Sequence, residues 1–79
     1  MGAMDKTISN KKYLRLIAWL RETRIQKKMS VRELGELLGV SNSFVTKIEQ
    51  AERRLDVYEY VQYCHVLQVD PKAGLKIIE

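Results

Sequence analysis

The sequence has 79 residues, of which 46% are hydrophobic and 30% charged, and its formal net charge is +4 at pH 7. This length allows one small domain, and the composition is that of a folded chain, so disorder is not the default expectation. No apolar run approaches the roughly 20 residues that span a bilayer, and no signal-peptide pattern opens the chain. The single cysteine, Cys64, excludes an internal disulfide, so we expect a cytoplasmic protein with no membrane partner.

Most of the basic charge lies in the first third of the chain. Residues 1–32 carry nine basic and two acidic side chains, whereas residues 33–79 carry five basic and eight acidic ones. A basic field favours a polyanionic partner such as nucleic acid, but many soluble proteins carry a similar charge. Charge alone therefore does not decide the function.

The apolar pattern predicts an all-α fold with five helices and no sheet. Apolar residues recur at intervals of three and four and do not alternate with polar ones over the length of a strand. Residues 1–4 look like a cloning remnant, so we expect residues 1–9 to form a flexible tail and residues 10–79 to form the domain.

The first helix is expected to begin after a cap at Ser9 or Asn10 and to end at about Lys28. Trp19 falls on the flank of its buried stripe, where it is expected to cover the edge of the core or the tail. The alternative is an exposed contact to a partner. The stripe itself consists of Tyr13, Leu16, Ile17, Leu20 and Arg24.

A second helix is predicted to begin at the capping-box pair Ser30 and Glu33 and to end at Gly39, and Ser41 is expected to cap a third. The expected buried face of the second helix consists of Leu34, Leu37 and Leu38.

Asp56 is expected to cap a fourth helix from Val57 to about Leu67, with Tyr58 and Tyr63 facing solvent. Its expected apolar positions are Val57, Tyr60, Val61, Cys64 and Leu67. A cap at Asp70 with proline at the first helical position predicts a short fifth helix, residues 71–78.

The third helix has two faces of different chemistry. Val45 and Ile48 are three positions apart and point inward. The opposite face presents short hydrogen-bonding groups and one cation, from Asn42, Ser43, Thr46 and Lys47. Such groups suit the edges of DNA bases, but they are equally acceptable on an ordinary solvated helix face.

Residues 12–75 resemble the lambda-repressor-like, XRE-type helix-turn-helix family of transcriptional regulators. The segments that carry the resemblance are LRETR at 20–24, SVRELG at 30–35, LGVS at 38–41, VTKIE at 45–49 and LQVDP at 67–71. The resemblance implies a five-helix domain with its helix-turn-helix motif at residues 31–50, and double-stranded DNA as the partner. It also implies a bacterial or phage-encoded regulator of transcription.

The resemblance gives the polar residues specific roles. It favours base contacts for Asn42, Ser43, Thr46 and Lys47. Phosphate contacts are expected from Arg32, Ser41, Gln50, Arg53 and Arg54, and a solvated basic loop is the alternative for the last two. Arg24 and Glu49 correspond to a structural ion pair. Gly35 stands where such motifs usually have alanine. The resemblance implies a small residue there, because the second and third helices cross too closely for a larger side chain.

The sequence departs from the family pattern at several positions. Val31 replaces a glutamine that donates to phosphate, so this contact is expected to be lost or taken over by Arg32. Lys28 and Ala51 replace frequent glycines, which suggests altered turns. Phe44 either touches a thymine methyl or sugar, or packs against the following loop.

A single recognition helix covers only a few base pairs, so we expect a homodimer on a roughly palindromic site. Val69, Leu75 and Ile78 are the expected dimer contacts, unless they only close the monomer core. The protein is expected to act as a repressor; the alternative is a helical protein-interaction module without DNA binding.

No catalytic function is expected. The chain has one histidine and one cysteine, so no zinc cluster or catalytic pair can be composed, and no glycine-rich phosphate loop is present. We expect no metal, no cofactor and no small-molecule substrate.

Overall fold

The computed structural model describes residues 9–79, and within this range it contains five α-helices and no strand. The helices are α2 (Lys11–Gln26), α3 (Val31–Leu38), α4 (Asn42–Glu49), α5 (Val57–Leu67) and α6 (Pro71–Ile78). The expected all-α, five-helix fold is therefore confirmed. The part of the expected tail at residues 1–8 lies outside the described residues.

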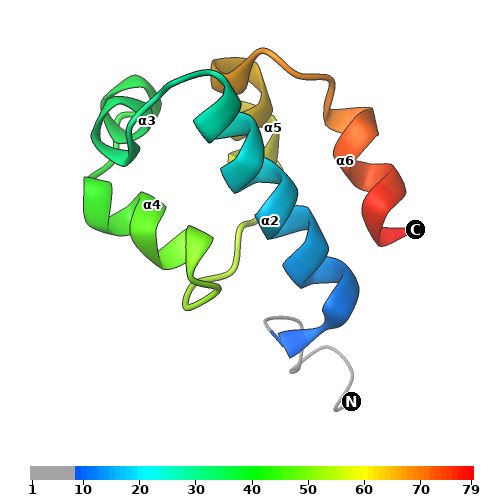
Figure 1. The fold of residues 1–79 in the computed structure, drawn as a ribbon. Coiled ribbons are helices and arrows are strands. Elements are labelled where there is room, and N and C mark those ends of the chain that lie inside the picture. The colour runs from blue at the N-terminus through cyan, green and yellow to red at the C-terminus, as the bar shows by residue number, and fades with distance from the viewer. Residues whose placement is uncertain (1–8) are drawn as a thin grey trace.

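The long helix α2 is the centre of the arrangement (Figure 1). Helices α3 and α4 lie on one side of it, α6 lies on the other, and α5 lies behind. Helix α2 packs against α4 and α6, while α5 packs against α3 and α6. The core lies between these helices and consists of Tyr13, Leu16, Ile17, Leu20, Leu34, Val45, Ile48, Tyr60, Tyr63, Cys64 and Leu67.

Each of the five helices in residues 9–79 begins at a polar cap that the sequence predicted. Asn10, and not Ser9, caps α2, since its Oδ1 accepts from the backbone N–H groups of Lys12 and Tyr13. Ser30 and Asp56 each form a full capping box, and Ser41 and Asp70 accept from the first turns of α4 and α6. Side-chain oxygens thus satisfy backbone donors that the helices leave free.

Helix α2 ends at Gln26, two residues before the predicted end, because Lys28 adopts a left-handed conformation with φ 57°. Ala51 (φ 58°) follows α4 in the same conformation. The expectation of altered turns at these two positions is wrong, since both residues take the backbone shape that a glycine would favour.

The structure contradicts the prediction for three side chains: Leu37 and Val57 were expected on buried faces, and Tyr63 was expected to face solvent. Leu37 is 62% exposed, because α3 meets its neighbours through Leu34, Gly35 and Leu38, and successive helical residues lie about 100° apart. Val57 is 82% exposed as the first residue of α5. Tyr63 is buried, because it lies on the side of α5 that meets α3, where it lines the same hollow as Leu38, Val40 and Phe44.

Gly74 on α6 is a packing feature that the sequence analysis did not find. A Cβ atom at this position would overlap the Tyr60 hydroxyl and would lie 2.7 Å from Cζ3 of Trp19. Helix α6 therefore lies directly against these two side chains. Trp19 is half-buried against the core, as predicted.

Candidate nucleic-acid interface

The exposed side of α4 carries a shallow hollow of about 240 Å³. Four predicted base-contacting residues line it together with one predicted phosphate contact and one residue that the sequence analysis missed. The lining residues are Asn42, Ser43, Thr46, Lys47, Gln50 and Glu52. Apart from the half-buried Thr46, all of them are exposed, so their polar groups can be reached from outside the domain.

The hydroxyl groups near this hollow differ in what they can offer a ligand. The Thr46 hydroxyl donates to the Asn42 carbonyl oxygen at 3.0 Å, so its oxygen remains as an acceptor. The Ser41 Oγ accepts from the Phe44 N–H at 3.2 Å, which leaves its hydrogen to donate. Ser41 therefore caps α4 and still presents a donor at the helix N-terminus, where backbone N–H groups favour anions.

Arg53 is occupied by partners within the protein. Its guanidinium group forms two hydrogen bonds to the Glu59 carboxylate, at 3.0 and 3.1 Å, and a third to the Arg54 carbonyl oxygen at 3.0 Å. It also lies 4.3 Å from the centre of the Phe44 ring. Hydrogen bonding to Arg53 holds the pKa of Glu59 below its ordinary value. These contacts fasten the loop after α4 to the first turn of α5, and Phe44 packs against this loop.

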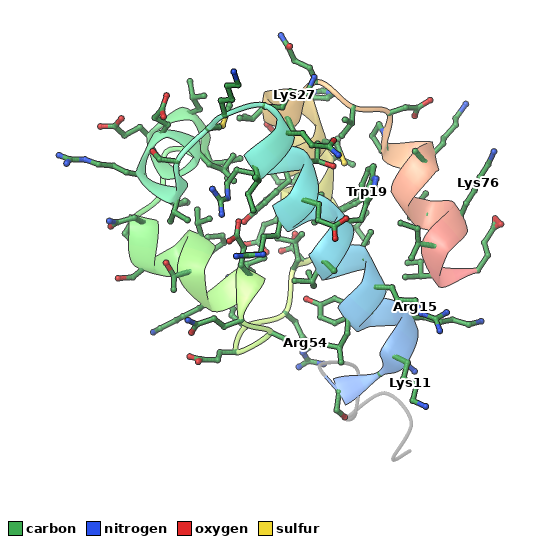
Figure 2. The ribbon with its side chains drawn as sticks, in the orientation of Figure 1. Lys11, Arg15, Trp19, Lys27, Arg54 and Lys76 are labelled. Carbon is green, nitrogen blue, oxygen red and sulfur yellow. The ribbon has the colours of Figure 1, made fainter. Side chains whose placement is uncertain are left out.

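Other cations near α4 remain exposed. Arg32 on α3 and Lys47 on α4 have no ion-pair partner among residues 9–79, and neither does Arg54 in the loop. By contrast, Lys11, Arg15 and Lys76 lie on the part of α2 and α6 that faces away from α3 and α4 (Figure 2). These three cations are therefore remote from the hollow.

Val31 is half-buried and packs against the core. Its apolar side chain cannot donate a hydrogen bond, and the adjacent Arg32 is the exposed cation of this turn.

An ion pair between Arg24 and Glu49 fixes α4 to α2. Nε of Arg24 lies 2.6 Å from Oε2 of Glu49, and Nη2 lies 3.1 Å from Oε1. The Arg24 Nη1 also donates to the Met29 carbonyl oxygen at 2.8 Å, which ties the loop between α2 and α3 to the pair. Both side chains are close to 90% buried, so this pair positions α4 and is not a surface contact.

Gly35 allows α3 to approach the turn that precedes α4. A Cβ atom on this residue would lie 3.0 Å from the Val40 carbonyl oxygen and 3.3 Å from the Ser41 carbonyl carbon. The close approach predicted here is confirmed, although the neighbour is the backbone of the turn and not a side chain of α4.

The comparisons with known proteins agree with this geometry. A family model of helix-turn-helix proteins matches residues 20–73. A solved structure of an XRE-family like protein from Pseudomonas syringae pv. tomato str. DC3000 is 41% identical, with 95% of this chain and 92% of that chain covered and a TM-score of 0.83. The chain belongs to the XRE-type helix-turn-helix family of DNA-binding transcription regulators.

A second solved structure similar to this family member is the clp gene regulator ClgR from C. glutamicum. It is 27% identical, with 80% of this chain and 82% of that chain covered and a TM-score of 0.73. The comparison with curated proteins gave no match.

Two of the three residues predicted at a dimer interface lie together in this XRE-type domain. Leu75 and Ile78 line an apolar hollow of about 170 Å³ between α5 and α6, whereas Val69 is not among its lining residues. The rest of the lining consists of Leu16, Leu55, Asp56, Val57, Tyr60, Val61 and Pro71. Val57 thus lines the same hollow as Leu75 and Ile78, and its side chain is largely exposed.

Among residues 9–79, no helix is long and apolar enough to cross a membrane. The same part of the chain contains no group of three or more histidine, cysteine or acidic side chains that could hold a metal ion.

Proposed function

We propose that this chain is a sequence-specific regulator that represses transcription by binding a roughly palindromic double-stranded DNA operator as a homodimer. The observation that carries the proposal is the hollow on α4, where exposed donors and acceptors gather on the second helix of a helix-turn-helix motif. A helix in this position can enter the major groove and present its N-terminal residues to base edges.

In this proposal Asn42, Ser43 and Lys47 donate to base edges, while Thr46 accepts. Phosphates are bound by Arg32, Ser41, Gln50 and Arg54 around the same surface. Arg53 acts indirectly, since its bonds to Glu59 hold the loop that presents Arg54. The two cations among the phosphate-binding residues, Arg32 and Arg54, neutralise about two phosphates per protomer and about four per homodimer, which gives a slope of about −3 to −4 for log K against log salt.

The dimer is proposed to form through the apolar hollow between α5 and α6. A two-fold interface uses the same patch on both copies, so the exposed Val57, Leu75 and Ile78 of one protomer meet those of the other. Two recognition helices then bind half-sites about one helical turn apart, which extends the sequence that is read.

Selection of bound duplexes from a random pool, followed by affinity measurements across a salt series, tests the DNA-binding proposal. Lys47→Ala is expected to reduce discrimination between sites, and Arg54→Ala to weaken all sites alike. Lys76→Ala is the matched control, because Figure 2 places this lysine on the opposite part of the domain. Absence of binding at low salt would exclude the regulator and support a protein-interaction module.

Sedimentation equilibrium tests the dimer, with circular dichroism to verify that each variant is folded. Leu75→Glu is expected to shift the protein to monomers because it places a charge in the apolar hollow. Leu37→Glu introduces the same change at an exposed leucine on α3 and is expected to leave the dimer intact. A wild-type chain that stays monomeric on a palindromic site would refute this arrangement.

A further inference from the structure

The hollow on α4 contains one acidic side chain, Glu52, among amide, hydroxyl and ammonium groups. Within residues 9–79 the ion pairs engage the carboxylates of Glu49 and Glu59, and none engages Glu52. An unpaired carboxylate and a DNA phosphate repel each other, so Glu52 weakens binding unless it meets a hydrogen-bond donor. The donors that DNA offers in the major groove are the amino groups of cytosine and adenine.

The backbone holds Glu52 beside Lys47. Ala51 takes the left-handed conformation, and its N–H donates to the Ile48 carbonyl oxygen at 3.1 Å. The Glu52 N–H then donates to the Lys47 carbonyl oxygen at 2.8 Å. This pair of bonds closes the end of α4, so Glu52 is anchored to the last turn of the helix.

An ammonium donor and a carboxylate acceptor therefore share one hollow. In the major groove a G·C base pair presents the complementary set, with O6 and N7 of guanine as acceptors and the N4 amino group of cytosine as a donor. We propose that Lys47 and Glu52 together recognise a G·C base pair, Lys47 donating to guanine and Glu52 accepting from cytosine N4. This inference rests on the proposed DNA binding and adds Glu52 as a specificity-determining residue.

Removing the Glu52 carboxylate distinguishes a contact to cytosine from a side chain that only faces solvent, because only the contact affects the preference for the G·C pair. Glu52→Ala removes a negative charge, so affinity for random duplex rises whichever role the residue has. If Glu52 contacts cytosine, preference for the G·C pair over other pairs falls about tenfold at the same time. Glu52→Gln keeps a carbonyl acceptor and is expected to recover part of this preference.

Glu22→Ala is the matched control, because it removes the same charge from the exposed face of α2. It is expected to leave the ranking of sites unchanged. If the Glu52→Ala variant ranked the DNA sites in the same order and with the same preferences as the wild type, the inference would be overturned.

Chemical substitution in the selected site isolates the proposed hydrogen bond. In N4-methylcytosine the one remaining N4–H pairs with guanine, so the donor that faces the major groove is lost. We expect this substitution to weaken wild-type binding about tenfold and to leave the binding of Glu52→Ala unchanged. Equal losses for both proteins would overturn the role of Glu52.

These outcomes separate the inference from the function on which it rests. A wild-type protein that binds no duplex refutes the proposed function itself. If the protein selects a site whose ranking does not depend on Glu52, the proposed function stands and the Glu52 contact alone is refuted.

Discussion

Removing the Glu49 carboxylate is expected to destabilise the domain severely. In Glu49→Leu the Arg24 guanidinium stays in a side chain that is only 11% exposed and loses both hydrogen bonds to the carboxylate. Its bond to the Met29 carbonyl oxygen remains but supplies no opposite charge. A buried charge left without its partner costs about 3–5 kcal/mol. A chain of this length has a free energy of unfolding of roughly 4–12 kcal/mol, so the loss is a large part of the total.

Removing both charges is expected to restore part of this stability. Arg24→Met combined with Glu49→Leu fills the same space with apolar groups and leaves no charge to be buried. Such replacements are often neutral or stabilising. Here the Met29 carbonyl oxygen also loses a donor, which costs about 1–3 kcal/mol. We expect the double variant to be more stable than Glu49→Leu by about 1–3 kcal/mol.

Urea unfolding followed by far-ultraviolet circular dichroism measures these differences, provided that the m-value is unchanged. Arg21→Ala is the internal control, because its Nε lies 3.9 Å from the same Glu49 carboxylate but its side chain is 56% exposed. A loss below about 0.5 kcal/mol is expected for this variant. If Glu49→Leu lost less than about 1 kcal/mol, or if the double variant were no better, the argument from burial would be refuted.

Other perturbations test separate parts of the fold. Gly74→Ala should lower stability by about 1–3 kcal/mol in urea unfolding, because a Cβ atom would overlap the Tyr60 hydroxyl; unchanged stability would contradict this packing. Ala51→Gly should raise stability by about 0.5–1 kcal/mol, since φ is 58° there; a decrease would argue against the left-handed turn. The lowered pKa of Glu59 means that its ion pair stabilises the fold above the ordinary carboxyl pKa and is lost as pH falls through the lowered value. Urea midpoints measured from pH 6 to about 3 should therefore fall less for Glu59→Gln than for the wild type, and parallel curves would exclude this contribution.

The first residues of the helices were predictable because they depend on local chemistry. Ser30 and Glu33, for example, make reciprocal hydrogen bonds within one turn, so the residue types and their spacing are sufficient to locate the start of α3. The Asp56 cap of α5 follows the same logic. The helix ends were less predictable, because Lys28 and Ala51 take a conformation that their residue types do not favour.

The degree of burial was harder to predict, because it depends on which helices meet. Periodicity marks an apolar stripe, but it does not say how wide a sector of the helix the neighbours cover. Tyr63 is buried since it lies on the side of α5 that meets α3, whereas Leu37 on α3 is largely exposed. Gly74 gave only a weak signal, as a glycine in the interior of a short helix.

The candidate interface shows why charge patterns alone do not locate a binding surface. Arg53 and Arg54 are adjacent in sequence and carry the same charge, so the sequence gives no reason to separate them. In the structure Arg53 is held by Glu59 and Phe44, while the Arg54 side chain is exposed. The partner that distinguishes them, Glu59, lies six residues further along and reaches Arg53 because it also caps α5. The Glu59 carboxylate thus holds both Arg53 and the first turn of α5. Arg54 is the neighbouring cation whose side chain remains exposed and available to a phosphate.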